Sequence, residues 1–220
     1  WFFRRLFEEY YPERRIAATR AFVEVMGGLG SHYCNEYIGG NRDVFGVLSA
    51  EEANLLHARS VARSNGWWDP VTTAMQGLWM VYQHTARPAE WSRLVEEIVP
   101  DFIDPVTDGP LPGKDEYWSL VTGYRVLLAR DARQWDRAER LQSVRVGWNR
   151  RRVAAILAKP PRDWDTAQKY AVHALAVSLQ DLAEIQRDQG SAKCVDGYLE
   201  GLSLAEQNQN FQLVADCAAN

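Results

Sequence analysis

The chain has 220 residues, with 25 Lys and Arg against 29 Asp and Glu, a net charge of −4 and 46% hydrophobic residues. This balance is typical of a folded globular protein and excludes a disordered chain, a collagen-like repeat and a disulfide-stapled miniprotein. The acidic pI of about 5.6 argues against a general nucleic-acid binder, because such proteins carry a basic excess.

Apolar residues recur every three or four positions along nearly the whole chain, which is the period of an α-helix. No segment shows the alternation of a half-buried strand, so the sequence predicts an all-α fold. The expected helices, in chain order, cover residues 2–10, 13–26, 29–38, 50–64, 69–86, 88–99, 115–132, 135–157, 164–188, 192–207 and 211–220.

Short breaks rich in glycine separate these helices, beginning with Gly27-Gly28. Helices joined by so few residues run antiparallel, so we expect a series of helical hairpins. Capping residues are predicted at Asp115 and Asp163, and a capping box at 49–52. Gly190 is expected just past the end of the longest helix.

One long break, residues 100–114, contains four of the nine prolines. It predicts a surface connector with few backbone hydrogen bonds, and so a preferred site of proteolysis. Its three aspartates lack the spacing of an EF-hand loop. The expected organisation is a helical linker with degenerate repeats (1–99), this connector, and a set of repeats cut short at the C-terminus (115–220). The start at Trp1, without an initiator Met, indicates a fragment of a longer protein.

Residues 190–205 resemble the second helix of a tetratricopeptide repeat. Cys194, Tyr198 and Gly201 stand at its small, aromatic and small positions, and Leu182 with Ala183 resembles the matching pair of the first helix. One residue is missing between Gly190 and Tyr198. The resemblance implies helical hairpins stacked as a right-handed superhelix, an α-solenoid.

Residues 44–99 carry a second resemblance, in the pattern Glu51-x-x-Asn54-Leu55 followed by Gly66-Trp-Trp and Gly77-Leu-Trp. The segment resembles the helical region that follows the nucleotide-binding core of bacterial STAND-type (NB-ARC-like) regulatory ATPases. The resemblance implies a cytoplasmic signalling arm that binds a partner. No G-x-x-x-x-G-K-[ST] motif is present, so this chain has no triphosphate loop of its own.

Motifs for chemistry are missing from the sequence. The four histidines are scattered, and the three cysteines (Cys34, Cys194 and Cys217) form no C-x-x-C pair, a usage that fits a reducing compartment. No run of 18 apolar residues occurs, so no membrane span is expected. We therefore predict a non-enzymatic protein without cofactor or metal. Two alternatives stay open: a small-molecule enzyme with a Trp-lined pocket between helices, and a structural spacer.

Charge is unevenly distributed. Residues 125–152 hold nine Arg against three acids, a net charge of +6, and residues 181–220 hold seven acids against two bases, a net charge of −5. A candidate binding stripe for carboxylates, phosphates or an acidic peptide comprises Arg130, Arg133, Arg137 and Arg140. The other interpretation is a solvated face that pairs with the acidic segment. In a repeat superhelix, the residues expected to face the groove are Lys169, His173, Gln180, Glu184 and Arg187. The expected partner is a protein, a peptide or another domain of the parent; nucleic acid is disfavoured.

Overall fold

The computed structural model describes residues 14–208, and the expected helices 2–10 and 211–220 lie outside this range. The described chain forms nine α-helices and one short 3-10 helix, with a single isolated β-bridge and no strand, which confirms the all-α prediction. Two compact units divide the chain, and the division falls between Glu96 and Glu97. This boundary lies inside a helix, because α6 runs continuously over Pro88–Phe102.

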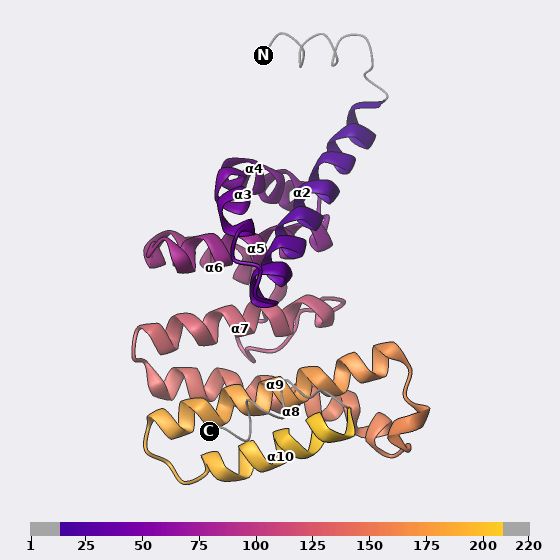
Figure 1. Cartoon of the computed structure of the whole chain (residues 1–220), viewed down its shortest axis with the longest axis vertical. Helices are drawn as coiled ribbons and strands as arrows, with labels where there is room; N and C mark the ends of the chain where they lie inside the picture. Colours follow the sequence, from indigo (N-terminus) through magenta and orange to yellow (C-terminus); the bar gives the residue numbers. More distant parts are fainter. Residues whose placement is uncertain (1–13, 209–220) are drawn as a thin grey trace. The chain divides into compact units, whose positions relative to one another are not determined.

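The first unit is organised around α5. Its helices are α2 (Arg15–Ile38), α3 (Val44–Ala50), α4 (Glu52–Ser64), α5 (Trp68–His84) and the start of α6. Helix α5 packs against both α2 and α4, and α2 also packs against α4 (Figure 1). The unit therefore differs from a simple series of hairpins, because the main partner of α2 is three helices further along the chain.

Close contact between α2 and α5 explains the glycines of both helices. A Cβ atom on Gly77 would lie 2.7 Å from the Cα of Gly30, and one on Gly27 would lie 2.5 Å from the Thr73 hydroxyl oxygen. The prediction that Gly27-Gly28 ends a helix is wrong, since α2 continues through both residues. Here glycine provides close approach of two backbones rather than a turn.

Positive-φ residues, by contrast, do mark helix ends. Gly40 (φ 102°) follows α2, Gly66 (φ 70°) follows α4 and Gly190 (φ 73°) follows α9 as expected. The predicted capping box at 49–52 is wrong: Ser49 lies inside α3, which ends at Ala50, and its hydroxyl has no hydrogen-bond partner among the described residues. Helix α4 begins at Glu52, whose carboxylate binds Arg87 at 2.6 Å and accepts a hydrogen bond from Tyr82 at 2.9 Å.

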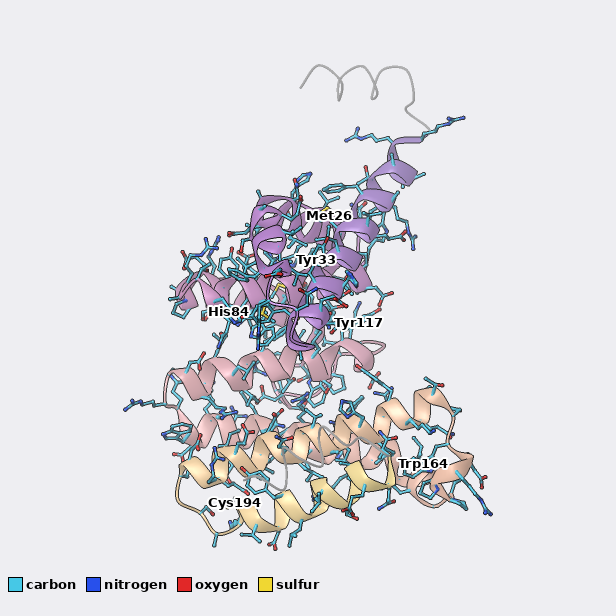
Figure 2. The ribbon with its side chains drawn as sticks, viewed as in Figure 1. Met26, Tyr33, His84, Tyr117, Trp164 and Cys194 are labelled. Atoms are coloured by element: carbon cyan, nitrogen blue, oxygen red, sulfur yellow. The ribbon has the colours of Figure 1, made fainter. Side chains whose placement is uncertain are left out.

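The second unit contains α7 (Asp115–Asp131), α8 (Trp135–Leu157), α9 (Thr166–Asp188) and α10 (Cys194–Gln207). Each helix packs against the next one in the sequence (Figure 1). The largest core side chain is Trp118, which is fully buried. Trp164, labelled in Figure 2, closes the end near the α8–α9 connection, where its indole N–H donates to the Ile156 carbonyl at 3.0 Å.

Two predicted N-terminal caps lie elsewhere. Asp115 is the first residue of α7 rather than its cap, and Asp163 belongs to the 3-10 turn Pro161–Asp163. The cap of α9 is Asp165, whose carboxylate accepts from the Gln168 backbone N–H at 2.8 Å while the Gln168 side chain accepts from the Asp165 N–H. The predicted cap of α9 is therefore two residues too early, because the 3-10 turn and the extended Trp164 precede the helix.

Helices α9 and α10 meet at small residues. A Cβ on Gly197 would lie 3.1 Å from the Ala183 Cβ. Tyr198 and Gly201 are both buried at the same helix. The close contact therefore pairs Ala183 with Gly197, which is the residue before the predicted aromatic position.

The 103–114 segment is more ordered than the expected connector. The Asp104 carboxylate accepts the backbone N–H groups of Val106 and Thr107, at 2.8 and 3.0 Å, and the Asp104 N–H donates to the Gly109 carbonyl at 2.9 Å. Leu111 closes the loop by donating its N–H to the Phe102 carbonyl at 3.0 Å. The expectation of few backbone hydrogen bonds is thus wrong, because an aspartate side chain supplies acceptors that the prolines do not remove.

Candidate binding surface

The nine arginines of residues 125–152 separate into two sets. Five are ion-paired with acids of the second unit, and four form no ion pair within residues 14–208. The paired set is Arg125, Arg130, Arg140, Arg145 and Arg150; the unpaired set is Arg133, Arg137, Arg151 and Arg152. The predicted stripe is thereby divided, because it contains members of both sets.

Arg130 and Arg145 join three helices. Arg130 on α7 reaches α9, where it lies 3.1 Å from the Glu184 carboxylate and 3.6 Å from that of Asp188. Arg145 on α8 binds Asp181 of α9 at 2.9 Å and donates to the Ser119 hydroxyl of α7 at 3.1 Å. These arginines therefore hold the α7–α8–α9 layer together, as the interpretation of pairing with the acidic segment anticipates.

Below these ion pairs lies a buried polar seam. The Gln142 amide donates to the Ser178 carbonyl at 2.6 Å, and the Asn149 amide donates to the Ser178 hydroxyl at 3.2 Å. That hydroxyl in turn donates to the Leu175 carbonyl at 2.8 Å. Buried polar groups are costly unless they are paired, so this seam fixes the register of α8 on α9.

Asp181 lies at the edge of the same seam. Burial raises the pKa of its carboxyl, and the charge of Glu184 raises it further, against the lowering effect of Arg145 and Arg130. The carboxylate is thus held in a site that disfavours its own charge, and the Arg145 guanidinium is the group that keeps it paired. Its place between two helices gives it a structural role.

Asp108 ties the loop to α7 and α8. Its carboxylate accepts from Arg125 at 2.9 Å and from Arg140, while its backbone carbonyl accepts from the Trp118 indole N–H at 2.8 Å. Burial alone would raise the pKa of Asp108, but the hydrogen bonds and charges of Arg140 and Arg125 outweigh it and hold the pKa below its usual range. Asp108 has φ 55°, a conformation that aspartate tolerates.

One side of α8 remains exposed and basic. Arg137, Arg140 and Arg151 all lie on it, since steps of three and eleven residues return close to the same side of a helix. We call these three residues the α8 arginine face. Val144 and Gly147 lie between them, and a Cβ on Gly147 would meet only the distal end of Arg151, at 3.8 Å. The face spans about 21 Å along the helix.

Two further arginines flank this face. Arg133 is exposed in the α7–α8 turn at φ 55°. The Arg152 guanidinium lies 5.4 Å from the centre of the Trp148 ring, and Trp148 packs on Trp118 with ring centres 5.3 Å apart. Arg152 is therefore held by an aromatic ring rather than by a carboxylate, which leaves its hydrogen-bond donors available to a ligand.

The predicted groove residues of α9 do not join the α8 arginine face. Lys169 and Arg187 are exposed at opposite ends of α9, and Arg187 lies 3.2 Å from Asp188. Gln180 and Glu184 belong to the pairing with Arg130. His173 is half-buried, and burial lowers its pKa. Helix α8 contacts α9 through Gln142 and Asn149, on the side away from its exposed arginines.

No group of three His, Cys, Asp or Glu side chains within the described part of the chain is arranged to hold a metal ion. Burial raises the pKa of Cys34 to about 11, so its thiol is a poor nucleophile at neutral pH. Among the helices between residues 14 and 208, none is long and apolar enough to cross a membrane.

Sequence reasoning counted Arg145 and Arg151 among the nine arginines of 125–152 but left both out of the candidate stripe, and it gave Asp108 and Asp181 no arginine partner. A usable signal exists for Arg145 alone, because it lies between Gln142 and Asn149 on the side of the predicted helix that carries Leu141 and Val146. Polar residues on a core-facing side indicate partners on a neighbouring helix. The pairing of Asp108 depends on the folding of the loop, which the sequence pattern does not encode.

Comparison with known proteins gives no relative. No protein-family model matches the sequence, and no curated protein or solved structure matches it either.

Proposed function

We propose that the chain is a non-enzymatic interaction arm that binds an acidic protein segment on the α8 arginine face. The observation that carries this proposal is the sorting of the arginines. The arginines that pack between elements of the second unit each lie within 4 Å of a carboxylate, as Arg125, Arg130 and Arg145 do. On the exposed side of α8, Arg137 and Arg151 form no ion pair within residues 14–208.

The support of α8 favours such a role. Its other sides are fixed by the polar seam to α9, by Arg145 to α7 and by the ion pair of Arg150 with Glu200 of α10. A helix held on three sides presents its fourth side with little conformational cost on binding. Guanidinium groups pair with carboxylates through two parallel hydrogen bonds, so the face favours Glu and Asp side chains.

Asp108 gives the face an internal competitor. Arg140 belongs to the exposed face, yet its guanidinium also donates to Asp108, which Arg125 holds in place. An acidic partner would compete with Asp108 for Arg140 and with the neutral Gln134 side chain, 3.0 Å away, for Arg137, whereas Arg151 has no such competitor. Arg140 is 58% exposed, so a ligand can reach it.

We propose further that this arm belongs to a bacterial, cytoplasmic regulatory ATPase of the STAND type. The resemblance of residues 44–99 supports this assignment, and so does the contact of α9 with α10 through the small residues Ala183 and Gly197. The stacking of α7 to α10 in sequence order supports an α-solenoid continued by further repeats. The assignment is tested by the sequence encoded upstream of Trp1, where a phosphate-binding loop is expected. Its absence would refute the assignment to a STAND-type ATPase.

Binding is tested with a fluorescent peptide of alternating Glu and Ala residues, measured by anisotropy. Arg137→Gln with Arg151→Gln should weaken binding at least about tenfold, while circular dichroism stays unchanged. Arg150→Gln is the matched control, because Arg150 is adjacent to Arg151 but is paired with Glu200. Affinity should also fall between about 0.05 and 0.3 M salt, as exposed charges are screened. Equal loss in the control and the double variant would refute a binding face.

A further inference from the structure

The acids of α9 and α10 separate into two sets, as the arginines of α7 and α8 do. Four of these acids each lie within 4 Å of an arginine: Asp181, Glu184, Asp188 and Glu200. The acids Asp196 and Glu206 are exposed on α10, and neither forms an ion pair within residues 14–208. The second unit therefore presents two carboxylates that its own arginines do not use.

The side of α10 that carries these two acids also exposes apolar side chains. Val195 is 54% exposed and Leu199 is 60% exposed. Steps of three, four and seven residues place Val195, Asp196, Leu199 and Glu206 on one side of the helix. We call these four residues the α10 outer stripe. The opposite side of α10, which includes Gly201, is buried, and α10 packs mainly against α9.

The α10 outer stripe does not meet the α8 arginine face of its own chain. Helix α10 is packed closely on α9, because a Cβ on Gly197 would lie 3.1 Å from the Ala183 Cβ. The ion pair of Arg150 with Glu200 then joins α8 and α10 beside each other. Two neighbouring helices held in this way present their exposed sides to solvent. A contact between the two exposed surfaces therefore requires two molecules.

The spacing of the charges on the two surfaces matches. Asp196 and Glu206 are ten residues apart, which is about 15 Å along α10. Arg140 and Arg151 are eleven residues apart, which is about 16.5 Å along α8. If α10 of one molecule lies antiparallel on α8 of another with Asp196 opposite Arg151, then Glu206 lies opposite Arg140. One register thus satisfies both carboxylates.

An apolar contact fits between these two ion pairs. In the same register Leu199 lies opposite Gly147, where an added Cβ would meet only the distal end of Arg151, at 3.8 Å. Half-buried Val144 lies one turn away on the same side of α8. A large side chain over a small residue allows close packing of two helices. The contact therefore has an apolar centre between two charged ends.

We propose that the acidic partner of the α8 arginine face is the α10 outer stripe of a second copy of this chain. This inference rests on the proposed function, because it names the partner of the same face. Residues 125–152 carry a net charge of +6 and residues 181–220 a net charge of −5, so the two regions attract each other. Since the two surfaces differ, each contact leaves one of each kind free, and copies join head to tail.

Sedimentation velocity of the full chain tests the contact. Two exposed ion pairs and one leucine make a weak, small interface, so we expect association over about 10–500 µM at 0.05 M salt and less at about 0.3 M. Asp196→Asn with Glu206→Gln should weaken association at least about fivefold. The matched control is Asp131→Asn with Asp163→Asn, which removes two exposed acids from other parts of the unit and should associate as wild type does. Equal weakening in the control would overturn the proposal.

Mixing two variants tests the pairing itself. Arg137→Gln with Arg151→Gln impairs the arginine face, and Asp196→Asn with Glu206→Gln impairs the acidic stripe. At a concentration where wild type associates, each variant alone should stay monomeric, with unchanged circular dichroism. Their equimolar mixture should form a dimer and no larger species, because one complementary pair of surfaces remains. A monomeric mixture, or a dimer of either variant alone, would overturn the proposal.

Peptide anisotropy separates failure of this inference from failure of the proposed function. The acidic-stripe variant retains the α8 arginine face, so it should bind the Glu-Ala peptide as tightly as wild type does. A wild-type chain that binds the peptide but stays monomeric at about 500 µM would refute the second copy as partner and leave the arginine face in place. Absence of both peptide binding and association would refute both.

Discussion

Replacing Asp108 by Asn should destabilise the second unit and strengthen acidic-peptide binding at the same time. The substitution removes the charge that Arg125 and Arg140 share. It keeps the shape of the side chain, and asparagine tolerates the φ of 55° at this position as well as aspartate does. The variant therefore isolates electrostatics from backbone strain.

The magnitude follows from the exposure of the two arginines. The Arg125 side chain is 14% exposed and that of Asp108 is 18% exposed, so this pair is largely removed from water. Hydrogen bonds to charged groups contribute about 1.5–3 kcal/mol when buried. Arg140 is 58% exposed, and such a pair contributes at most about 1 kcal/mol. Since the amide oxygen of the substituted side chain can still accept one neutral hydrogen bond, we expect a loss of about 1–3 kcal/mol of unfolding free energy.

The pH dependence provides a second check. The pKa of Asp108 lies below its usual range in the folded state, so the native state keeps this carboxylate charged at pH values where the unfolded chain protonates it. The stabilisation is present above the unfolded pKa of about 4 and is lost as the pH falls through the folded value. The difference between wild type and variant should therefore be constant from about pH 5 to 7 and shrink below about pH 4.

Urea unfolding followed by circular dichroism measures the loss of unfolding free energy and its pH dependence. Peptide anisotropy measures the change in binding affinity. Release of Arg140 from Asp108 should tighten binding of the Glu-Ala peptide, by a factor of about 2–5 if the pair is worth up to about 1 kcal/mol. A variant as stable as wild type at neutral pH would refute the role of Asp108 as a tether. Weaker peptide binding by a folded variant would refute competition for Arg140.

Three further predictions concern the fold. Gly77→Ala should lower the unfolding free energy by about 1–3 kcal/mol in thermal unfolding, because its Cβ would lie 2.7 Å from the Cα of Gly30. The control Gly46→Ala, with open space around it, should be neutral or stabilising. Equal effects of the two substitutions would contradict the α2–α5 contact. Asp165→Ala should lower the unfolding free energy by about 1 kcal/mol, because the capping box is lost. Asp163→Ala should lower it by less than about 0.5 kcal/mol. The reverse order would support Asp163 as the cap, as predicted from the sequence. Limited proteolysis with a protease of broad specificity should spare the 103–114 loop, and a first cut within it would show that its hydrogen bonds do not protect it.

Helix positions were largely predictable because the period of apolar residues is a local signal. Helices α7 and α8 end within one residue of their predicted bounds. Gly27-Gly28 misled the prediction, since a glycine pair has the same sequence whether it breaks a helix or admits a neighbouring one. Only the contacts of α2 with Thr73 and Gly77, which lie far away in the chain, distinguish the two cases.

The candidate site was predictable in composition but not in geometry. The excess of arginine in residues 125–152 is visible in the sequence, and so is the acidic segment that follows it. Which arginines are used internally depends on how α7 and α8 turn against α9. Arg130 and Arg137 are seven residues apart, yet the turn at 132–134 places Arg130 beside Glu184 and leaves Arg137 exposed.

Reversal of charge specificity tests the α8 arginine face most directly. The measurement compares the Glu-Ala peptide with a Lys-Ala peptide of equal length, for wild type and for Arg137→Glu with Arg151→Glu. If the face recognises carboxylates, wild type should prefer the Glu peptide and the variant should prefer the Lys peptide, each by at least about tenfold, with unchanged circular dichroism. A folded variant that still prefers the Glu peptide as strongly as wild type would contradict the account.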